Sequence, residues 1–83
     1  MYLGIKSVKA LENYELLLEF ENGEERIFDL KPYLLLGRFV ELQDPEKFKN
    51  VKVSFDAVEW PGIGDLDPEF LYKESRKIEK ALT

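Results

Sequence analysis

The chain has 83 residues, of which 45% are hydrophobic and 35% charged, and its formal net charge is −5. This length allows one domain, residues 1–83, and the composition is that of a globular chain rather than a disordered one. Because the sequence holds no cysteine and no histidine, it excludes disulfides, a thiolate nucleophile, the commonest general base and the commonest zinc ligands.

The first half of the chain predicts a sheet. Residues 5–11 form a candidate first strand, and residues 12–13 a turn into a hairpin that spans residues 15–29. Asn22-Gly23 accepts positive φ at both central positions of a two-residue turn, and such a turn places Glu19 opposite Arg26. A bulged three-residue loop is the alternative, and it would change the pairing.

Short helices and two further strands are expected next. A helical turn over residues 32–36 begins at a proline and ends at Gly37, and a second over residues 44–48 has Asp44 as its N-cap. The alternation of residues 51–55 predicts a half-buried strand. A turn at Asp56-Ala57 leads to a short strand over residues 58–60, and Pro61 is expected to stop further pairing.

The last predicted element is a helix that Asp67 caps and Pro68 opens. Its apolar stripe at helical spacing predicts that it continues to the end of the chain. The residues on this stripe are Leu71, Ser75, Ile78 and Leu82. The order β-β-β-short helices-β-β-α indicates an α+β fold, in which one antiparallel sheet of about five strands packs with short helices and a C-terminal helix.

Several segments, taken together, resemble the bacterial domain of unknown function DUF2442. They are Leu17-Leu18-Glu19-Phe20-Glu21-Asn22-Gly23-Glu24, Phe28-Asp29-Leu30, Pro32-Tyr33-Leu34, Phe39-Val40-Glu41-Leu42, Asp44-Pro45-Glu46-Lys47-Phe48, Val58-Glu59-Trp60-Pro61, Asp65-Leu66, Pro68-Glu69 and Leu71-Tyr72. After Trp-Pro the family usually shows an Asn-Gly-like pair, where this chain has Gly62-Ile63-Gly64. The resemblance implies a small α+β fold and no catalytic residue or cofactor. It also implies a partner encoded nearby, since some members resemble antitoxins.

These observations favour a non-enzymatic protein-interaction module, antitoxin-like, that binds a small basic protein. A surplus of carboxylates steers association with a basic partner, and it disfavours nucleic acid and anionic membranes. No apolar run approaches the roughly 20 residues that span a bilayer, and residues 1–6 lack a signal-peptide layout. We therefore expect a cytoplasmic protein with no membrane association; the exposed sheet edges leave a homodimer open.

The candidate partner-binding residues come from two segments. The first is the acidic hairpin, whose charge either keeps a sheet edge solvated or docks a basic partner. The second is the loop that starts at an aromatic residue, which is either a core side chain or an interface anchor. The candidates are Glu19, Glu21, Glu24, Glu25, Trp60 and Asp65.

Two alternative functions stay open. One is a DNA-associated regulator, although the sequence shows no basic DNA-binding segment. The other is a metal- or small-ligand-binding domain, because Asp65, Asp67 and Glu69 carry hard oxygen donors. Since Asp67 also fits a helix cap and no calcium-loop spacing is present, we assign no catalytic, cofactor-binding or metal-binding residue.

Overall fold

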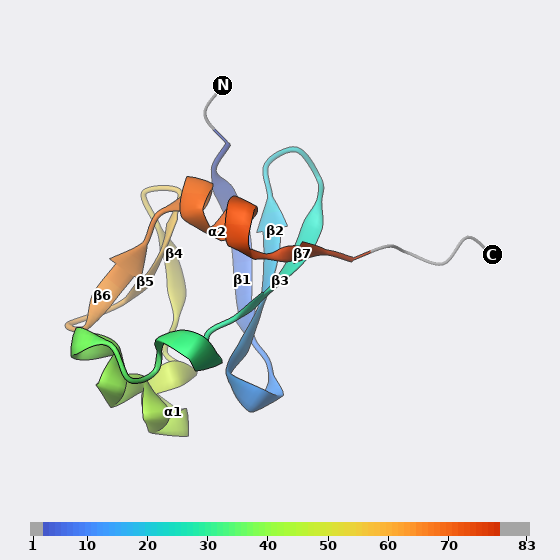
Figure 1. Ribbon diagram of the computed structural model, residues 1–83. Coiled ribbons are helices and arrows are strands. Elements are labelled where there is room, and N and C mark those ends of the chain that lie inside the picture. The colour runs from blue at the N-terminus through green and yellow to red at the C-terminus, as the bar shows by residue number, and fades with distance from the viewer. Residues whose placement is uncertain (1–2, 79–83) are drawn as a thin grey trace.

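The computed structural model describes residues 3–78, which form two antiparallel sheets and several short helices (Figure 1). One sheet has the order β1-β2-β3-β7 and the other the order β4-β5-β6. The α+β class is confirmed, but residues 3–78 build seven strands in two sheets rather than about five in one. The strands are β1 (Ile5–Ala10), β2 (Glu15–Phe20), β3 (Glu25–Asp29), β4 (Lys52–Ser54), β5 (Ala57–Trp60), β6 (Gly64–Leu66) and β7 (Arg76–Lys77).

The helices are short, and most are 3₁₀ helices. They are η1 (Glu12–Tyr14), η2 (Lys31–Tyr33), η3 (Gly37–Gln43), α1 (Pro45–Phe48) and α2 (Pro68–Glu74). Asp44 caps α1 as predicted, since its carboxylate accepts a hydrogen bond from the Glu46 N–H at 3.0 Å. None of the helices within residues 3–78 is long and apolar enough to cross a membrane.

The β2–β3 hairpin closes with the bulged three-residue loop, and the predicted pairing of Glu19 with Arg26 is wrong. The Gly23 N–H donates to the Phe20 carbonyl and the Phe20 N–H to the Glu24 carbonyl, each at 2.9 Å. Gly23 has a φ of 88°, the left-handed conformation that such a bulge requires. The register consequently shifts by one residue, and Arg26 lies opposite Leu18.

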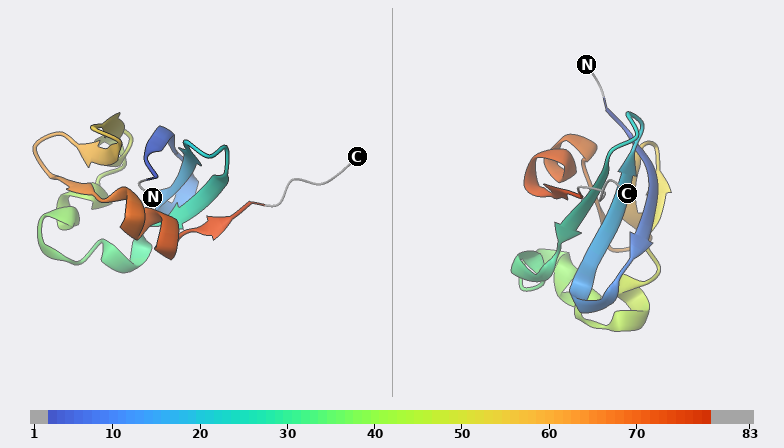
Figure 2. Two further views of the ribbon diagram at one scale, coloured as in Figure 1. Left: turned by 90° about the horizontal axis from the view of Figure 1, so that it is seen from above. Right: turned by 90° about the vertical axis from the view of Figure 1, so that its right-hand side faces the viewer.

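The core lies between the two sheets and α2. Strand β2 alternates strictly, so that Leu16, Leu18 and Phe20 are fully buried while its other side chains face outward. No helix formed by residues 3–78 covers the outer face of β1, β2 and β3 (Figure 2). The second sheet and the helices contribute the remaining buried side chains to the same cluster, among them Leu42, Phe48, Val58, Trp60, Leu66 and Leu71.

The helix α2 begins as predicted but ends much earlier. The Asp67 carboxylate accepts hydrogen bonds from the N–H groups of Glu69 and Phe70 at 3.0 and 3.3 Å. The helix stops at Glu74, because Ser75 is extended and β7 then pairs with β3. The predicted continuation through Ile78 is therefore wrong, and Leu82 lies outside the described residues.

Strand β6 was not expected from the sequence, which predicted that Pro61 would stop pairing. Pro61 and Gly62 instead occupy the centre of a turn, in which the Ile63 N–H donates to the Trp60 carbonyl at 2.9 Å. Gly62 has a φ of 79°, and proline followed by such a glycine is the preferred pair for a type II turn. Because Pro61 lies in the turn rather than in the ladder, β6 pairs with β5 directly after it.

Candidate functional site

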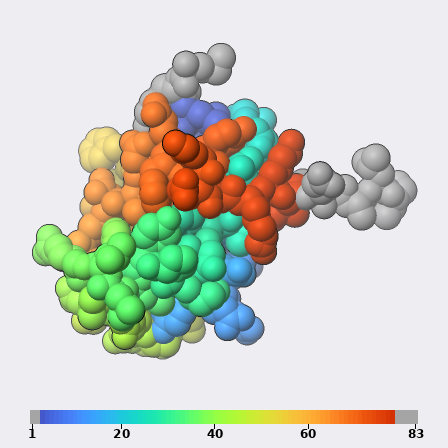
Figure 3. All heavy atoms as spheres, viewed as in Figure 1, coloured from blue at the N-terminus to red at the C-terminus, as the bar shows by residue number. Residues whose placement is uncertain are grey.

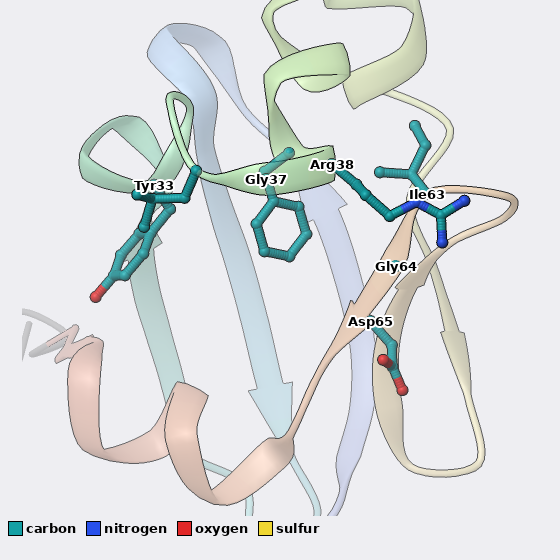
Figure 4. A pocket seen from close by; sticks show the side chains of 8 residues that line it. Tyr33, Gly37, Arg38, Ile63, Gly64 and Asp65 are labelled. Atoms are coloured by element: carbon teal, nitrogen blue, oxygen red, sulfur yellow. The ribbon is translucent and has the colours of Figure 1, made fainter.

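An apolar pocket of about 380 Å³ opens where β6 faces the segment from η2 to the start of η3 (Figure 4). In the space-filling view, residues of this segment lie next to β6 and α2 on the same face of the molecule (Figure 3). Two glycines, Gly37 and Gly64, leave space at its edges. The side chains that matter for its chemistry are Tyr33, Leu36, Arg38, Phe39, Ile63 and Asp65.

Core aromatic rings hold the walls of the pocket in place. The Tyr33 ring stacks on Phe28 at a centroid distance of 5.6 Å and meets Phe70 edge-on at 5.7 Å. The Phe39 ring meets Trp60 edge-on at 6.0 Å. These geometries are the ones that aromatic pairs prefer, so two walls of the pocket, Tyr33 and Phe39, pack against the core.

The segment that forms one side of the pocket exposes an unusual amount of apolar surface. Leu35 is 80% exposed, Leu36 is 56% exposed and Val40 is 46% exposed. Backbone hydrogen bonds stabilise the conformation of the segment. The Leu36 N–H donates to the Tyr33 carbonyl, and the Phe39 N–H donates to the Leu36 carbonyl. The Arg38 guanidinium also donates to the Gly62 carbonyl at 3.3 Å, which ties η3 to the β5–β6 turn. Grouped exposed apolar side chains mark interaction surfaces in soluble domains.

A second cluster of polar side chains joins the β2–β3 hairpin to the end of α2. The Arg26 guanidinium lies 4.4 Å from the centre of the Tyr72 ring and forms an ion pair with Glu24 at 3.0 Å. It also donates to the Ser75 hydroxyl and the Ser75 carbonyl, each at 2.8 Å. The Tyr72 hydroxyl donates to Glu24 at 2.6 Å, as does the Asn22 amide at 2.7 Å. Through these contacts the cluster joins the β2–β3 hairpin to the end of α2.

This cluster changes the protonation of two of its members. The hydrogen bond from Tyr72 holds the pKa of Glu24 below its usual range, although partial burial opposes the effect; Asn22 and Arg26 strengthen it. The hydrogen bond to Glu24 raises the pKa of Tyr72 above its usual value, and burial adds to this. Both shifts favour the charged carboxylate and the neutral phenol, which is the state that the native contacts need.

At least three of the four predicted acidic residues of the hairpin make side-chain contacts within the domain. Glu19 accepts a hydrogen bond from Ser7 and lies 3.8 Å from the Lys6 ammonium. Glu25 lies opposite Glu19 in the β2–β3 register, and Glu21 accepts from the Gly4 N–H at 3.2 Å in the turn. Glu24 belongs to the Arg26 cluster, so the contacts of Glu19, Glu21 and Glu24 involve three different parts of the fold.

The two candidates from the loop, Trp60 and Asp65, differ in their solvent exposure. Trp60 is only 1% exposed, and its indole N–H donates to the Phe48 carbonyl at 2.9 Å. It is therefore a core side chain, the structural alternative that the sequence left open. Asp65 is exposed and lines the apolar pocket. It is the one predicted candidate at this pocket, which the acidic hairpin does not line.

The sequence analysis did not identify Leu36, Phe39 and Ile63 as pocket residues. One signal was present, because three consecutive leucines, residues 34–36, come immediately before Gly37. A helical turn this short cannot bury three successive side chains on one face. Asp65 and Asp67 do not converge on a common point with Glu69: within residues 3–78, no group of three carboxylates could hold a metal ion.

Comparison with known protein families gives a match. The family model of DUF2442, described as a protein of unknown function, matches residues 5–77. No curated protein and no solved structure matches the chain. The match spans both sheets and the whole pocket, so the pocket lies within the region that defines the family.

Proposed function

The chain belongs to the DUF2442 family, and we propose that it is a non-enzymatic domain that binds another protein. The observation that carries this proposal is the apolar pocket beside the exposed Leu35, Leu36 and Val40. Such a surface is stabilised when a partner removes it from water, by about 25 cal/mol for each Å² of apolar area. A rigid apolar wall also limits the entropy lost on binding.

Charge indicates the kind of partner. The chain has a formal net charge of −5, and an acidic domain attracts a basic protein over distances of about a Debye length. The partner we propose is a small basic protein encoded nearby, which the domain neutralises in an antitoxin-like manner in the cytoplasm. In this arrangement the pocket supplies affinity, whereas the distributed carboxylates supply rate and specificity.

The proposal is tested by co-expressing the tagged chain with the product of the adjacent gene and co-purifying the two at low and high salt. We expect a complex that weakens as salt rises. Leu36→Asp places a charge on the pocket wall, and we expect it to weaken the complex at least about tenfold, as for a residue at the centre of an interface. Since Leu36 is largely exposed, the melting temperature of the Leu36→Asp variant should stay near that of the parent chain.

The matched control is Phe55→Ser. Phe55 is 98% exposed but lies in the β4–β5 turn, away from the pocket, so the complex should survive its replacement. Absence of any complex between the two parent proteins at low salt would contradict the proposed function. Equal loss with both variants would contradict the assignment of the pocket.

A further inference from the structure

Strand β6 has an unused edge beside the pocket. Within residues 3–78 it pairs only with β5, at one side of the three-stranded sheet. Gly64 and Asp65, which belong to this strand, line the pocket (Figure 4). The free edge of a strand presents backbone N–H and C=O groups that can pair with an added strand. The pocket therefore combines backbone hydrogen-bonding groups with apolar walls.

Charges across the sheet indicate which residue an added strand should carry. On its outer face, Lys52 lies opposite Glu59, and Glu59 lies opposite Asp65. The Asp65 carboxylate is exposed and forms no hydrogen bond or ion pair within the described residues. On a strand added beside β6, a cation at the position opposite Asp65 would face its carboxylate directly. Such cross-strand pairs of opposite charge are favourable.

The inner face next to β6 accepts apolar side chains. Gly64 has no side chain there, and a Cβ at this position would lie 3.5 Å from the Phe39 ring. A residue opposite Gly64 on an added strand points to the same face of the sheet. It would contact Phe39 and enter the space between Leu36 and Ile63, which form the walls of the pocket.

We infer that an extended segment of the partner, with the pattern apolar–Lys/Arg–apolar, binds as an added strand on the free edge of β6. The basic residue pairs with Asp65, and the apolar residues on either side of it face the pocket. Pairing β6 with itself about Asp65 is disfavoured, because it would add a third carboxylate to a row in which Glu59 already lies opposite Asp65. The inference rests on the proposed function and specifies how the partner is recognised.

The probe is the synthetic peptide acetyl-Thr-Leu-Lys-Leu-Thr-amide, titrated into the ¹⁵N-labelled chain and followed by NMR. We expect saturable shifts of the amides of Gly64, Asp65 and Leu66 and of the pocket wall. The peptide with glutamate in place of lysine should bind about two- to fivefold more weakly, the range set by a cross-strand charge pair. With Asp65→Lys as the protein, the order of the two peptides should reverse.

Strand pairing itself is tested by N-methylation, because alternate amides of a strand point to opposite edges. One peptide is methylated at both leucine nitrogens and another at the lysine nitrogen. We expect one of the two to lose binding and the other to keep it. Equal binding of both, or no saturable shift with the parent peptide, would overturn the inference.

These outcomes are distinguishable from failure of the proposed function. If the complex with the adjacent gene product forms and Leu36→Asp disrupts it, while the peptide does not bind, the pocket is an interface that does not use strand addition. If that complex does not form, the proposed function itself is wrong. Loss of the complex on Asp65→Lys, with the melting temperature of the protein unchanged, supports both the proposed function and the addition of a strand to β6.

Discussion

At the scale of single residues, Arg26 helps to explain where α2 ends, which the sequence of the helix itself does not. Its guanidinium binds Glu24, stacks on Tyr72 and donates to both oxygens of Ser75. Ser75 follows the last residue of α2, where backbone carbonyls need partners. The contact joins residues 49 positions apart, so it fixes the end of the helix from a distance.

The lowered pKa of Glu24 predicts a pH dependence of stability. A folded-state pKa below the unfolded value, about 4.3, means that the stabilisation is present above that pH and is lost as pH falls through the folded pKa. Glu24→Gln should therefore melt at a lower temperature than the parent chain at neutral pH. The difference should narrow at acid pH, where the parent carboxyl is also neutral.

Thermal unfolding across the acid range measures this difference. The control is Glu12→Gln, which removes an exposed carboxylate of the same type outside the cluster. Its melting temperature should stay close to the parent value at every pH. A Glu24→Gln difference that does not change with pH would contradict the role given to the ionised carboxylate.

At the scale of elements, the β4–β5 hairpin has a strained turn. Phe55 and Asp56 have φ values of 51° and 65°, which a two-residue hairpin turn requires at both central positions. The predicted turn at Asp56-Ala57 was one residue too late. Aspartate tolerates this conformation, whereas an aromatic residue does not. The turn is held by the Ile5 N–H, which donates to the Asp56 carbonyl at 2.9 Å.

Replacing Phe55 by asparagine should stabilise the protein by about 1 kcal/mol, because asparagine adopts the left-handed conformation more readily. In a domain of this size that corresponds to a rise in melting temperature of about 4–8 °C. Phe55→Ala is the control, since it removes the exposed ring but keeps the steric conflict of the Cβ. Equal stabilisation by alanine and asparagine would show that ring exposure, rather than backbone strain, is responsible.

Elements that depend on local chemistry could be predicted from the sequence. The structure confirms the caps at Asp44 and Asp67 and the first three strands, β1, β2 and β3. Each of these predictions rests on residues close together in the chain. The end of α2 could not be predicted, since it depends on Arg26. The hairpin register stayed open between two loop types, and β6 was missed, because several turn types fit the same glycine and proline positions.

At the scale of the whole molecule, the two sheets meet at a glycine. The Glu21 N–H donates to the Gly4 carbonyl, and a Cβ on Gly4 would lie 2.8 Å from both Asp56 and Glu21. At the other end, η2, η3 and β6 leave the apolar pocket open. The candidate site therefore arises where segments about 30 residues apart come together, which composition and periodicity do not report. Of the residues that line the pocket, Asp65 alone was predicted as a candidate from the sequence.

The central claim is that the partner binds at this pocket rather than along the acidic hairpin. Amide hydrogen exchange, measured for the free chain and for its complex with the adjacent gene product, tests it most directly. The account predicts added protection over residues 33–39 and 64–66 in the complex. Protection confined to residues 19–25, with exchange at the pocket unchanged, would contradict it.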